Sequence, residues 1–180
     1  MSFNLIIDSL NGAGNDGNLT YSIDWSFLAY DVEYDMTFSY RSTAPISSLD
    51  RQDPDGANGG ELYVSMPDLP MQCNYEVVGP TNKNYGRAKN SSIIGVLTPI
   101  VYSNGDVDVN DGDYFIFNTG HTYNPPVRVQ RPMNNVFRVQ LYSKGVASNG
   151  TDNPASREIM DGFAQDYMLI LNFKKCSRNE

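Results

Sequence analysis

The sequence is poor in the residues that most enzyme and metal sites use. It has one histidine and two cysteines among 180 residues. A catalytic triad built on histidine would have to use His121. This residue follows Gly120 and precedes a Pro-Pro pair, which indicates a loop, and the chain has no Gly-x-Ser-x-Gly sequence. One histidine and two distant cysteines do not make a zinc site. We therefore expect no catalytic residue, no metal site and no cofactor.

The two cysteines, Cys73 and Cys176, are too few for a disulfide scaffold. We expect both thiols to be reduced. Cys176 falls in the last five residues, 176–180, which we interpret as a short C-terminal tail after a single domain of residues 1–175. A chain of 180 residues is of the usual size for one domain with a substantial core.

Other absences exclude two classes of partner. No apolar run approaches 18 residues, so we expect no membrane span. The start, MSFNLIIDS, lacks the features of a secretory signal. The formal net charge is −8 and no run of Lys or Arg is present. Phosphate backbones are bound by basic surfaces, so we expect no nucleic-acid partner.

Alternation of apolar and polar residues is the strongest pattern that is present. In Tyr21–Phe27 and in Tyr34–Arg41 every second residue is apolar. A period of two is typical of a β-strand with one face in the core. Further strand patterns lie between turn-rich segments, at Phe3–Ile7, Glu61–Met66, Ser92–Ser103, Asp113–Asn118, Val127–Arg131, Val136–Tyr142 and Tyr167–Phe173. We expect a break or bulge at Pro99, because proline cannot donate to a central ladder.

Helical patterns are scarce. Asn153 and Pro154 predict the start of one short helical turn within Asp152–Phe163, and a second turn is predicted at Ala44–Leu49. Many strands, long loops and little helix predict an all-β fold, an antiparallel two-sheet sandwich. The wide strand spacing favours a single jelly roll of about eight strands with long loops and one or two short helical turns; an up-and-down barrel is the alternative.

Acidic residues offer two weaker hypotheses. Asp106, Asp108 and Asn110 alternate as oxygen ligands for calcium could, but glycine and glutamate are missing from the EF-hand positions. We interpret Asp106–Asp113 as a solvated turn. Asp24 and Asp35 lie on the polar sides of their strand patterns, where a charge needs no catalytic explanation. We expect that the protein is not an enzyme.

The last predicted strand carries an unbroken apolar run, Tyr167–Leu171. A half-solvated strand needs only alternate residues to be apolar, so this run indicates cover on both faces. The cover is either the rest of this chain or another chain.

Three segments resemble single jelly-roll capsid proteins of large eukaryotic double-stranded DNA viruses, the minor capsid and vertex (penton) proteins. They are His121–Ser143, with its Asn-Pro-Pro entry and VFRVQL strand, then Asp166–Lys175, with DYMLILNF, and Leu62–Tyr75. The resemblance implies a single jelly roll with no catalytic residues, which holds larger capsomers together or closes a vertex.

A capsid role implies particular partners. These would be the major capsid protein, neighbouring minor proteins and further copies of the same chain, in a virion whose proteins are made in the host cytoplasm. The long loops Ser42–Gly60, Pro67–Ser91 and Lys144–Gln165 are where contacts are most easily built. The alternative is a carbohydrate- or receptor-binding β-sandwich of a virion fibre or appendage, because exposed tyrosines can stack on sugars.

Overall fold

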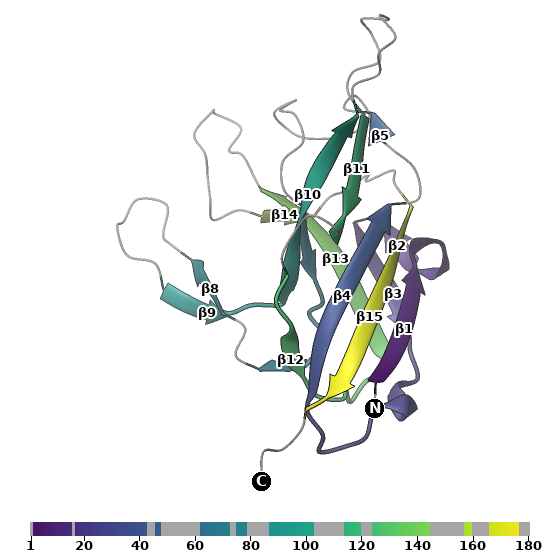
Figure 1. Cartoon of the computed structure of the whole chain (residues 1–180), viewed down its shortest axis with the longest axis vertical. Coiled ribbons are helices and arrows are strands. Elements are labelled where there is room, and N and C mark those ends of the chain that lie inside the picture. Colours follow the sequence, from purple (N-terminus) through teal and green to yellow (C-terminus); the bar gives the residue numbers. More distant parts are fainter. Residues whose placement is uncertain are drawn as a thin grey trace, which may run out of the picture.

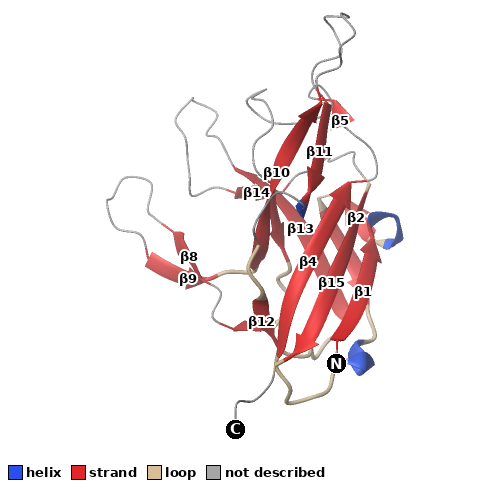
Figure 2. Ribbon diagram, viewed as in Figure 1, coloured by secondary structure: helices blue, strands red, loops and turns tan. Residues whose placement is uncertain are grey.

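The chain is almost entirely β-structure in the computed structural model, which describes residues 2–15, 17–42, 46–47, 62–72, 75–78, 87–102, 114–119, 124–144, 157–159 and 166–176 (Figures 1 and 2). The strands are β1 (Ser2–Asp8), β2 (Ala13–Asn15), β3 (Asn18–Ser22), β4 (Tyr34–Ser42), β5 (Ile46–Ser47), β6 (Leu62–Ser65), β7 (Met71–Gln72), β8 (Tyr75–Val78), β9 (Arg87–Asn90), β10 (Ile93–Tyr102), β11 (Tyr114–Asn118), β12 (Val127–Val129), β13 (Val136–Lys144), β14 (Arg157–Ile159) and β15 (Tyr167–Lys175).

Most of the strands belong to two antiparallel sheets that share β10, while β8 and β9 pair with each other as a separate two-stranded sheet. The first sheet has the order β1-β15-β4-β11-β10 and the second has the order β10-β6-β13-β3-β2. Strands that follow one another in the chain often lie in opposite sheets, as β3 and β4 do, and Figure 1 shows the first sheet in front of the second. This arrangement confirms the predicted all-β sandwich. None of the described helices is long and apolar enough to span a membrane.

The core lies between the two sheets and is rich in aromatic rings. The Trp25 ring meets Phe137 of the second sheet and Phe173 of the first edge-on, with ring centroids 5.3 and 6.3 Å apart. Tyr40 and Tyr167 stack with centroids 5.1 Å apart. Such rings bury a large apolar area, and edge-on contacts add to that gain. The Trp25 ring therefore bridges the two sheets, whereas the Tyr40–Tyr167 pair packs within the first sheet.

The predicted strand at Tyr21–Phe27 is wrong in its second half. Strand β3 ends at Ser22, and Trp25–Phe27 forms a short 3₁₀ helix, η2. The Asp24 side chain accepts a hydrogen bond from the Ser26 backbone N–H at 2.9 Å, as an N-cap does. This local bond competes with extended structure. Trp25 is nevertheless buried, as its place in the alternating pattern predicted.

Both predicted helical turns are also wrong. Residues 157–159 form β14, which pairs with β13, and residues 46–47 form β5, which pairs with β11. Pairing with a neighbouring strand overrides a weak local preference in each case. Asn153 and Pro154 lie outside the described residues. A 3₁₀ helix that the sequence did not predict, η1 (Ser9–Asn11), follows β1, with Asp8 as its N-cap.

Pro99 does not break β10, which corrects another prediction. The register shift of β10 lies between Ile93 and Gly95, whereas Pro99 pairs in register with Phe117. Residues 93–97 pair with β6 and residues 98–102 with β11. At Pro99 the strand therefore pairs with β11 alone among the described strands. A proline is tolerated here, because the other edge of the strand has no described ladder that would need a backbone N–H.

Gly95 lies where β10 approaches the first sheet closely. A Cβ at this position would clash with Asn124 Oδ1 and would lie 2.5 Å from the Phe38 ring. The Asn124 side chain accepts a hydrogen bond from the Val96 N–H at 3.0 Å and donates one to the Val96 carbonyl at 3.3 Å. The space that glycine leaves therefore allows Asn124 to pair with the backbone of β10.

We expect Gly95→Ala to lower the free energy of unfolding by about 1–3 kcal/mol, the usual cost of overfilling a packed site. Urea unfolding followed by circular dichroism measures this loss. Thr37→Ala, on the exposed outer face of β4, is the control and should change stability by less than about 0.5 kcal/mol. Equal stability of Gly95→Ala and the parent protein would show that the site is roomier than these distances indicate.

An ion pair fixes the turn before β7 to the second sheet. Asp68 accepts hydrogen bonds from Arg138 Nε and Nη2, each at 2.8 Å, and from the Arg138 backbone N–H at 2.9 Å. The hydrogen bonds from Arg138, and then its charge, hold the pKa of Asp68 below its usual value. A bidentate pair of this kind is among the stronger surface contacts.

We expect Asp68→Asn to cost about 1–2 kcal/mol at pH 7, because the charge-assisted bonds are lost. The pKa of Asp68 is lower in the folded than in the unfolded chain. Its contribution is therefore present above the unfolded value, about 3.9, and disappears as the pH falls through the lower folded value. Stability measured from pH 7 to pH 3 should fall less steeply in the variant.

The control is the exposed pair of Asp35 and Arg128, whose atoms lie 3.5 Å apart. Exposed pairs contribute little, so Asp35→Asn should cost less than about 1 kcal/mol. A larger loss in Asp35→Asn than in Asp68→Asn would contradict the ranking of the two pairs.

Candidate interaction surfaces

The residues considered for chemistry do not form a site in the described part of the chain. His121, Cys73 and the acidic segment Asp106–Asp113 lie outside the described residues. Among those that are described, no group of three or more His, Cys, Asp or Glu residues could hold a metal ion. That the chain has no catalytic residue and no cofactor therefore stays a prediction.

The two carboxylates singled out in the sequence have local partners. Asp24 caps η2, and hydrogen bonds from the backbone and the hydroxyl of Ser26 hold its pKa below the usual value. Asp35 lies on the outer face of β4, beside Arg128. Each carboxylate thus has a structural explanation in its own surroundings.

Cys176 continues directly from β15. Its backbone N–H donates to the Glu33 carbonyl at 3.0 Å, so this residue is tied to the segment before β4. Partial burial, and then the neighbouring Asp35, raise the pKa of the Cys176 thiol. A neutral thiol is a poor nucleophile.

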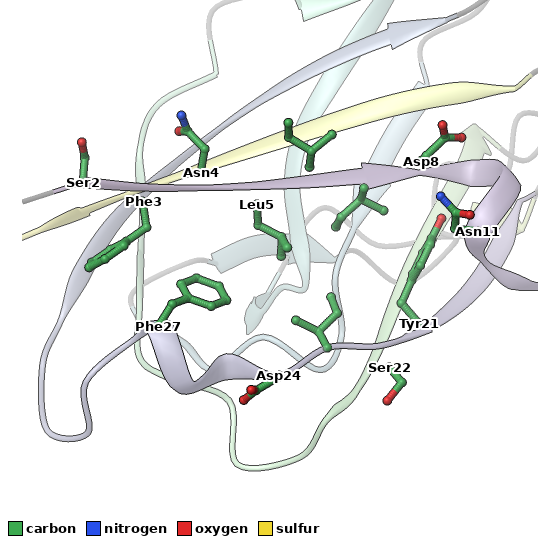
Figure 3. A pocket seen from close by; sticks show the side chains of 13 residues that line it. Ser2, Phe3, Asn4, Leu5, Asp8, Asn11, Tyr21, Ser22, Asp24 and Phe27 are labelled. Atoms are coloured by element: carbon green, nitrogen blue, oxygen red, sulfur yellow. The ribbon is translucent and has the colours of Figure 1, made fainter.

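A groove of about 830 Å³ opens between the two sheets beside β1 (Figure 3). Figure 3 shows Phe3 and Leu5 pointing from β1 towards Phe27, while Ser2 and Asn4 point the other way. The lining residues are all of β1, Asn11 at the end of η1, Tyr21–Asp24 and Phe27. The groove therefore lies where the first sheet ends at β1 and the chain between β3 and η2 forms the opposite wall.

The floor of the groove is apolar because of the period of β1. Phe3, Leu5 and Ile7 share the inward face, with Ile7 buried and the other two half-buried against the core. The Phe3 and Phe27 ring centroids are 6.1 Å apart. The groove is thus an opening onto the edge of the core.

The rim of the groove is polar and acidic. Asp8, Asn11, Ser22 and Asp24 line it, and none of the lining residues is Lys or Arg. Burial, with a smaller effect from the negative charge of Asp8, raises the pKa of Tyr21 to about 12. The Tyr21 side chain is therefore a neutral phenol at physiological pH. An incoming group would meet an apolar floor flanked by negative charge.

The outer face of the first sheet carries a second apolar surface. Ile6 and Ile170 are directly opposite each other on β1 and β15, and they are 64% and 36% exposed. Met168, two residues before Ile170 on the same face, is half-buried. We call Ile6, Met168 and Ile170 the outer-face patch. Neighbouring Asn4 and Asn172 hydrogen-bond to each other at 2.7 Å.

The outer-face patch answers the question raised by the Tyr167–Leu171 run. Tyr167, Leu169 and Leu171 point into the core and are fully buried. No described segment of this chain covers Ile170 completely, because 36% of it is exposed. Cover of both faces by the described residues is therefore ruled out, and cover by another chain is the alternative that stays open.

A third exposed group lies around the start of β13. Met133 is 93% exposed and Val136 is 54% exposed. Nearby in sequence, the Arg131 guanidinium lies 3.9 Å from the centroid of the exposed Tyr30 ring and donates to the Leu28 carbonyl at 3.0 Å. One face of the Tyr30 ring is thus occupied by a cation.

The groove and the outer-face patch could not be predicted from the sequence, because both depend on which strands are neighbours. One signal was available: in Phe3–Ile7 the alternation predicts a polar residue at position 6, and Ile6 is apolar. Of the long loops expected to make contacts, Ser42–Gly60 and Lys144–Gln165 lie largely outside the described residues. Pro67–Ser91 is not one long loop, because it contains β7 and the paired strands β8 and β9.

Comparison with known proteins gives a match in structure but none in sequence. No protein-family model matches the chain, and no curated protein sequence matches it. The crystal structure of the mavirus penton protein is similar over 97% of this chain and 99% of that one, with a TM-score of 0.54 and 8% sequence identity. At this identity the match shows the fold. The chain has the single jelly-roll fold that its sequence predicted, the fold of a viral penton protein.

Proposed function

We propose that this chain is a structural protein of a viral capsid, a penton or minor capsid subunit that assembles through protein–protein contacts. The observation that carries the proposal is the fold match to a penton protein over almost the whole of both chains. A jelly roll can serve many functions, so fold likeness alone is an analogy. The surface of the molecule has to supply the remaining support.

The outer-face patch supports assembly. Ile6, Ile170 and Met168 form an apolar strip on a sheet face, where a single chain needs polar residues. Exposed apolar strips of this kind mark protein contacts. We infer that further copies of this chain, or neighbouring capsid proteins such as the major capsid protein, cover the strip in the virion.

The charge of the chain also fits this role better than contact with a genome. The formal net charge is −8. A surface of that sign repels phosphate and suits contacts with proteins. The proposal therefore assigns no nucleic-acid contact and no reaction to the chain, which would be made in the host cytoplasm and act in the virion.

The alternative function is a carbohydrate-binding module, and the structure supports it less than it supports assembly. The support would have to come from the exposed aromatic residue Tyr30. Tyr30 is 65% exposed and could stack on a sugar. However, Arg131 lies over one face of its ring. Binding of glycans by the purified chain, lost in Tyr30→Ala, would favour this alternative over assembly.

The test is the mass of the purified chain in solution, measured by light scattering and native mass spectrometry, with negative-stain images for symmetry. We expect a homo-oligomer whose mass is a multiple of 20.1 kDa, and a five-fold ring if the chain occupies a vertex. Replacing Ile170 by glutamate should shift the equilibrium to monomers, whereas Asn134→Glu, at an exposed position before β13 of the second sheet, should leave it unchanged.

Two negative results would count against this proposal. If the chain stays a monomer at high concentration and does not bind capsid shells of the virus that encodes it, the proposal is wrong. If oligomers form equally well with Ile170→Glu, assembly uses another surface.

A further inference from the structure

We propose that the groove beside β1 binds an extended segment of a partner protein, which adds to the first sheet as a further strand. The segment would alternate apolar and polar residues and would be neutral or basic. This inference does not depend on the capsid role, because it follows from the edge of the sheet and from the groove. Three observations carry it.

The first observation is the position of β1 in the sheet order. It is the terminal strand of the first sheet and pairs only with β15 among the described strands. In an antiparallel ladder, about half of the residues of an edge strand direct their N–H and C=O groups away from the paired neighbour. None of the described backbone hydrogen bonds outside the strand pairs involves residues 2–8. These groups are available to another strand.

The second observation is that β1 lacks the protection usual in edge strands. Natural edges are short, carry lysine or proline, or contain a bulge. β1 is 7 residues long, contains no Pro or Lys, and pairs with β15 in unbroken register. A strand of this length would offer roughly 23 Å of continuous edge. Strand addition uses such an edge for affinity.

The third observation is the groove itself, which supplies side-chain selectivity. Phe3 and Leu5 are half-buried and face Phe27 and the Tyr21–Asp24 segment across about 830 Å³ of space. An added strand would place every second side chain over this apolar floor. Its other side chains would lie on the solvent face, in line with the outer-face patch.

The negative charge of the groove favours a neutral or basic partner segment over a second copy of this chain. Asp8 and Asp24 line the groove without any Lys or Arg among the lining residues. Pairing β1 with β1 of a second copy would bring two acidic rims together on chains of net charge −8. Like charges at an interface oppose association, whereas a basic residue beside the strand would be favoured.

Hydrogen–deuterium exchange of the full chain tests the proposal. The probe is the synthetic peptide Lys-Val-Thr-Val-Thr-Val-Thr-Val-Lys, and two matched peptides carry Glu in place of both Lys, or Pro in place of the central Thr. With the first peptide at saturation we expect exchange within residues 2–8 to slow by about tenfold or more. The proline peptide should give no protection, because it cannot complete the ladder.

The acidic peptide should bind about threefold to tenfold more weakly than the lysine peptide at low salt, and the difference should shrink at high salt. Asn11→Lys places a positive charge on the exposed end of η1, at the groove. This variant should reduce the preference for the lysine peptide, because the new positive charge offsets one of the two acidic residues that line the groove. It leaves the core untouched and so keeps the test independent of folding.

Two variants of β1 separate the groove from the outer face. Leu5→Glu puts a charge on the groove floor and should abolish protection by the peptide, whereas Ile6→Glu, on the adjacent outward position, should retain it. Thermal melts show whether each variant is folded, and the Asn11→Lys result stands if Leu5→Glu is not.

Three results would overturn the inference. The first is no protection of residues 2–8 at millimolar lysine peptide. The second is equal protection by the proline peptide. The third is protection in the free chain that rises with its own concentration, which would make a second copy the occupant. The third result is measured in the Ile170→Glu variant, which is expected not to associate through the outer-face patch, so failure here is distinct from failure of the proposed capsid role.

Discussion

Replacing Trp25 by alanine is expected to lower the free energy of unfolding by about 3–5 kcal/mol, the usual loss for a large aromatic side chain in a core. Trp25 is 1% exposed, and its ring contacts Phe27, Phe137 and Phe173. Phe137 and Phe173 belong to different sheets. The truncation would therefore leave a cavity at the point where the two layers meet.

Urea unfolding followed by circular dichroism at a single backbone wavelength measures the loss, because the variant removes the only tryptophan in the chain. Trp25→Phe should recover part of the stability, since it keeps an aromatic ring in place. Met133→Ala, at a side chain that is 93% exposed, should be neutral within about 0.5 kcal/mol. A loss below about 1 kcal/mol for Trp25→Ala would show that the sheets meet elsewhere.

Trp25 also shows what a local pattern can predict and what it cannot. Its burial follows from the alternation in Tyr21–Phe27, and burial is what the structure shows. Its conformation does not follow, because the Asp24 side chain caps a 3₁₀ helix there. The periodicity of the sequence predicts whether a residue is buried or exposed. A single side-chain hydrogen bond can change the backbone conformation of that residue without changing its burial.

Long strands were predictable because each one carries its own period of two. β4, β13 and β15 begin within one residue of their predicted starts and form the centre of the sheets. The short strands could not be predicted in this way. β14 and β5 have 3 and 2 residues, and each exists because a longer neighbour offers a ladder. Local sequence says little about segments of this length.

The groove could not be predicted for a different reason. The FNLII sequence predicts a strand with Phe3, Leu5 and Ile7 on one face, and β1 has that face. Whether the strand lies at the edge or in the middle of a sheet depends on residues 167–175, which pair with it from the far end of the chain. Strand order is non-local, so the free edge and the groove became visible only in the structure.

Replacing Leu171 by alanine gives the second large effect, an expected loss of about 2–5 kcal/mol. Leu171 lies on β15, which is paired on both sides, with Leu5 of β1 and Phe38 of β4 as its neighbours. It is fully buried. Because β15 is held between two strands, the backbone cannot easily collapse into the space that the missing side chain leaves, and most of the cavity cost should remain.

The matched control is Ile170→Ala, one residue away on the same strand. Ile170 points outward and is 36% exposed, so its truncation should cost no more than about 1 kcal/mol in the isolated chain. Urea unfolding at a concentration where the chain is monomeric compares the two. Ile170→Ala should instead weaken self-association, which dilution in light scattering measures. Equal losses of stability in the two variants would mean that a further part of the chain covers the outer face, and the surface assigned to assembly would be part of the core.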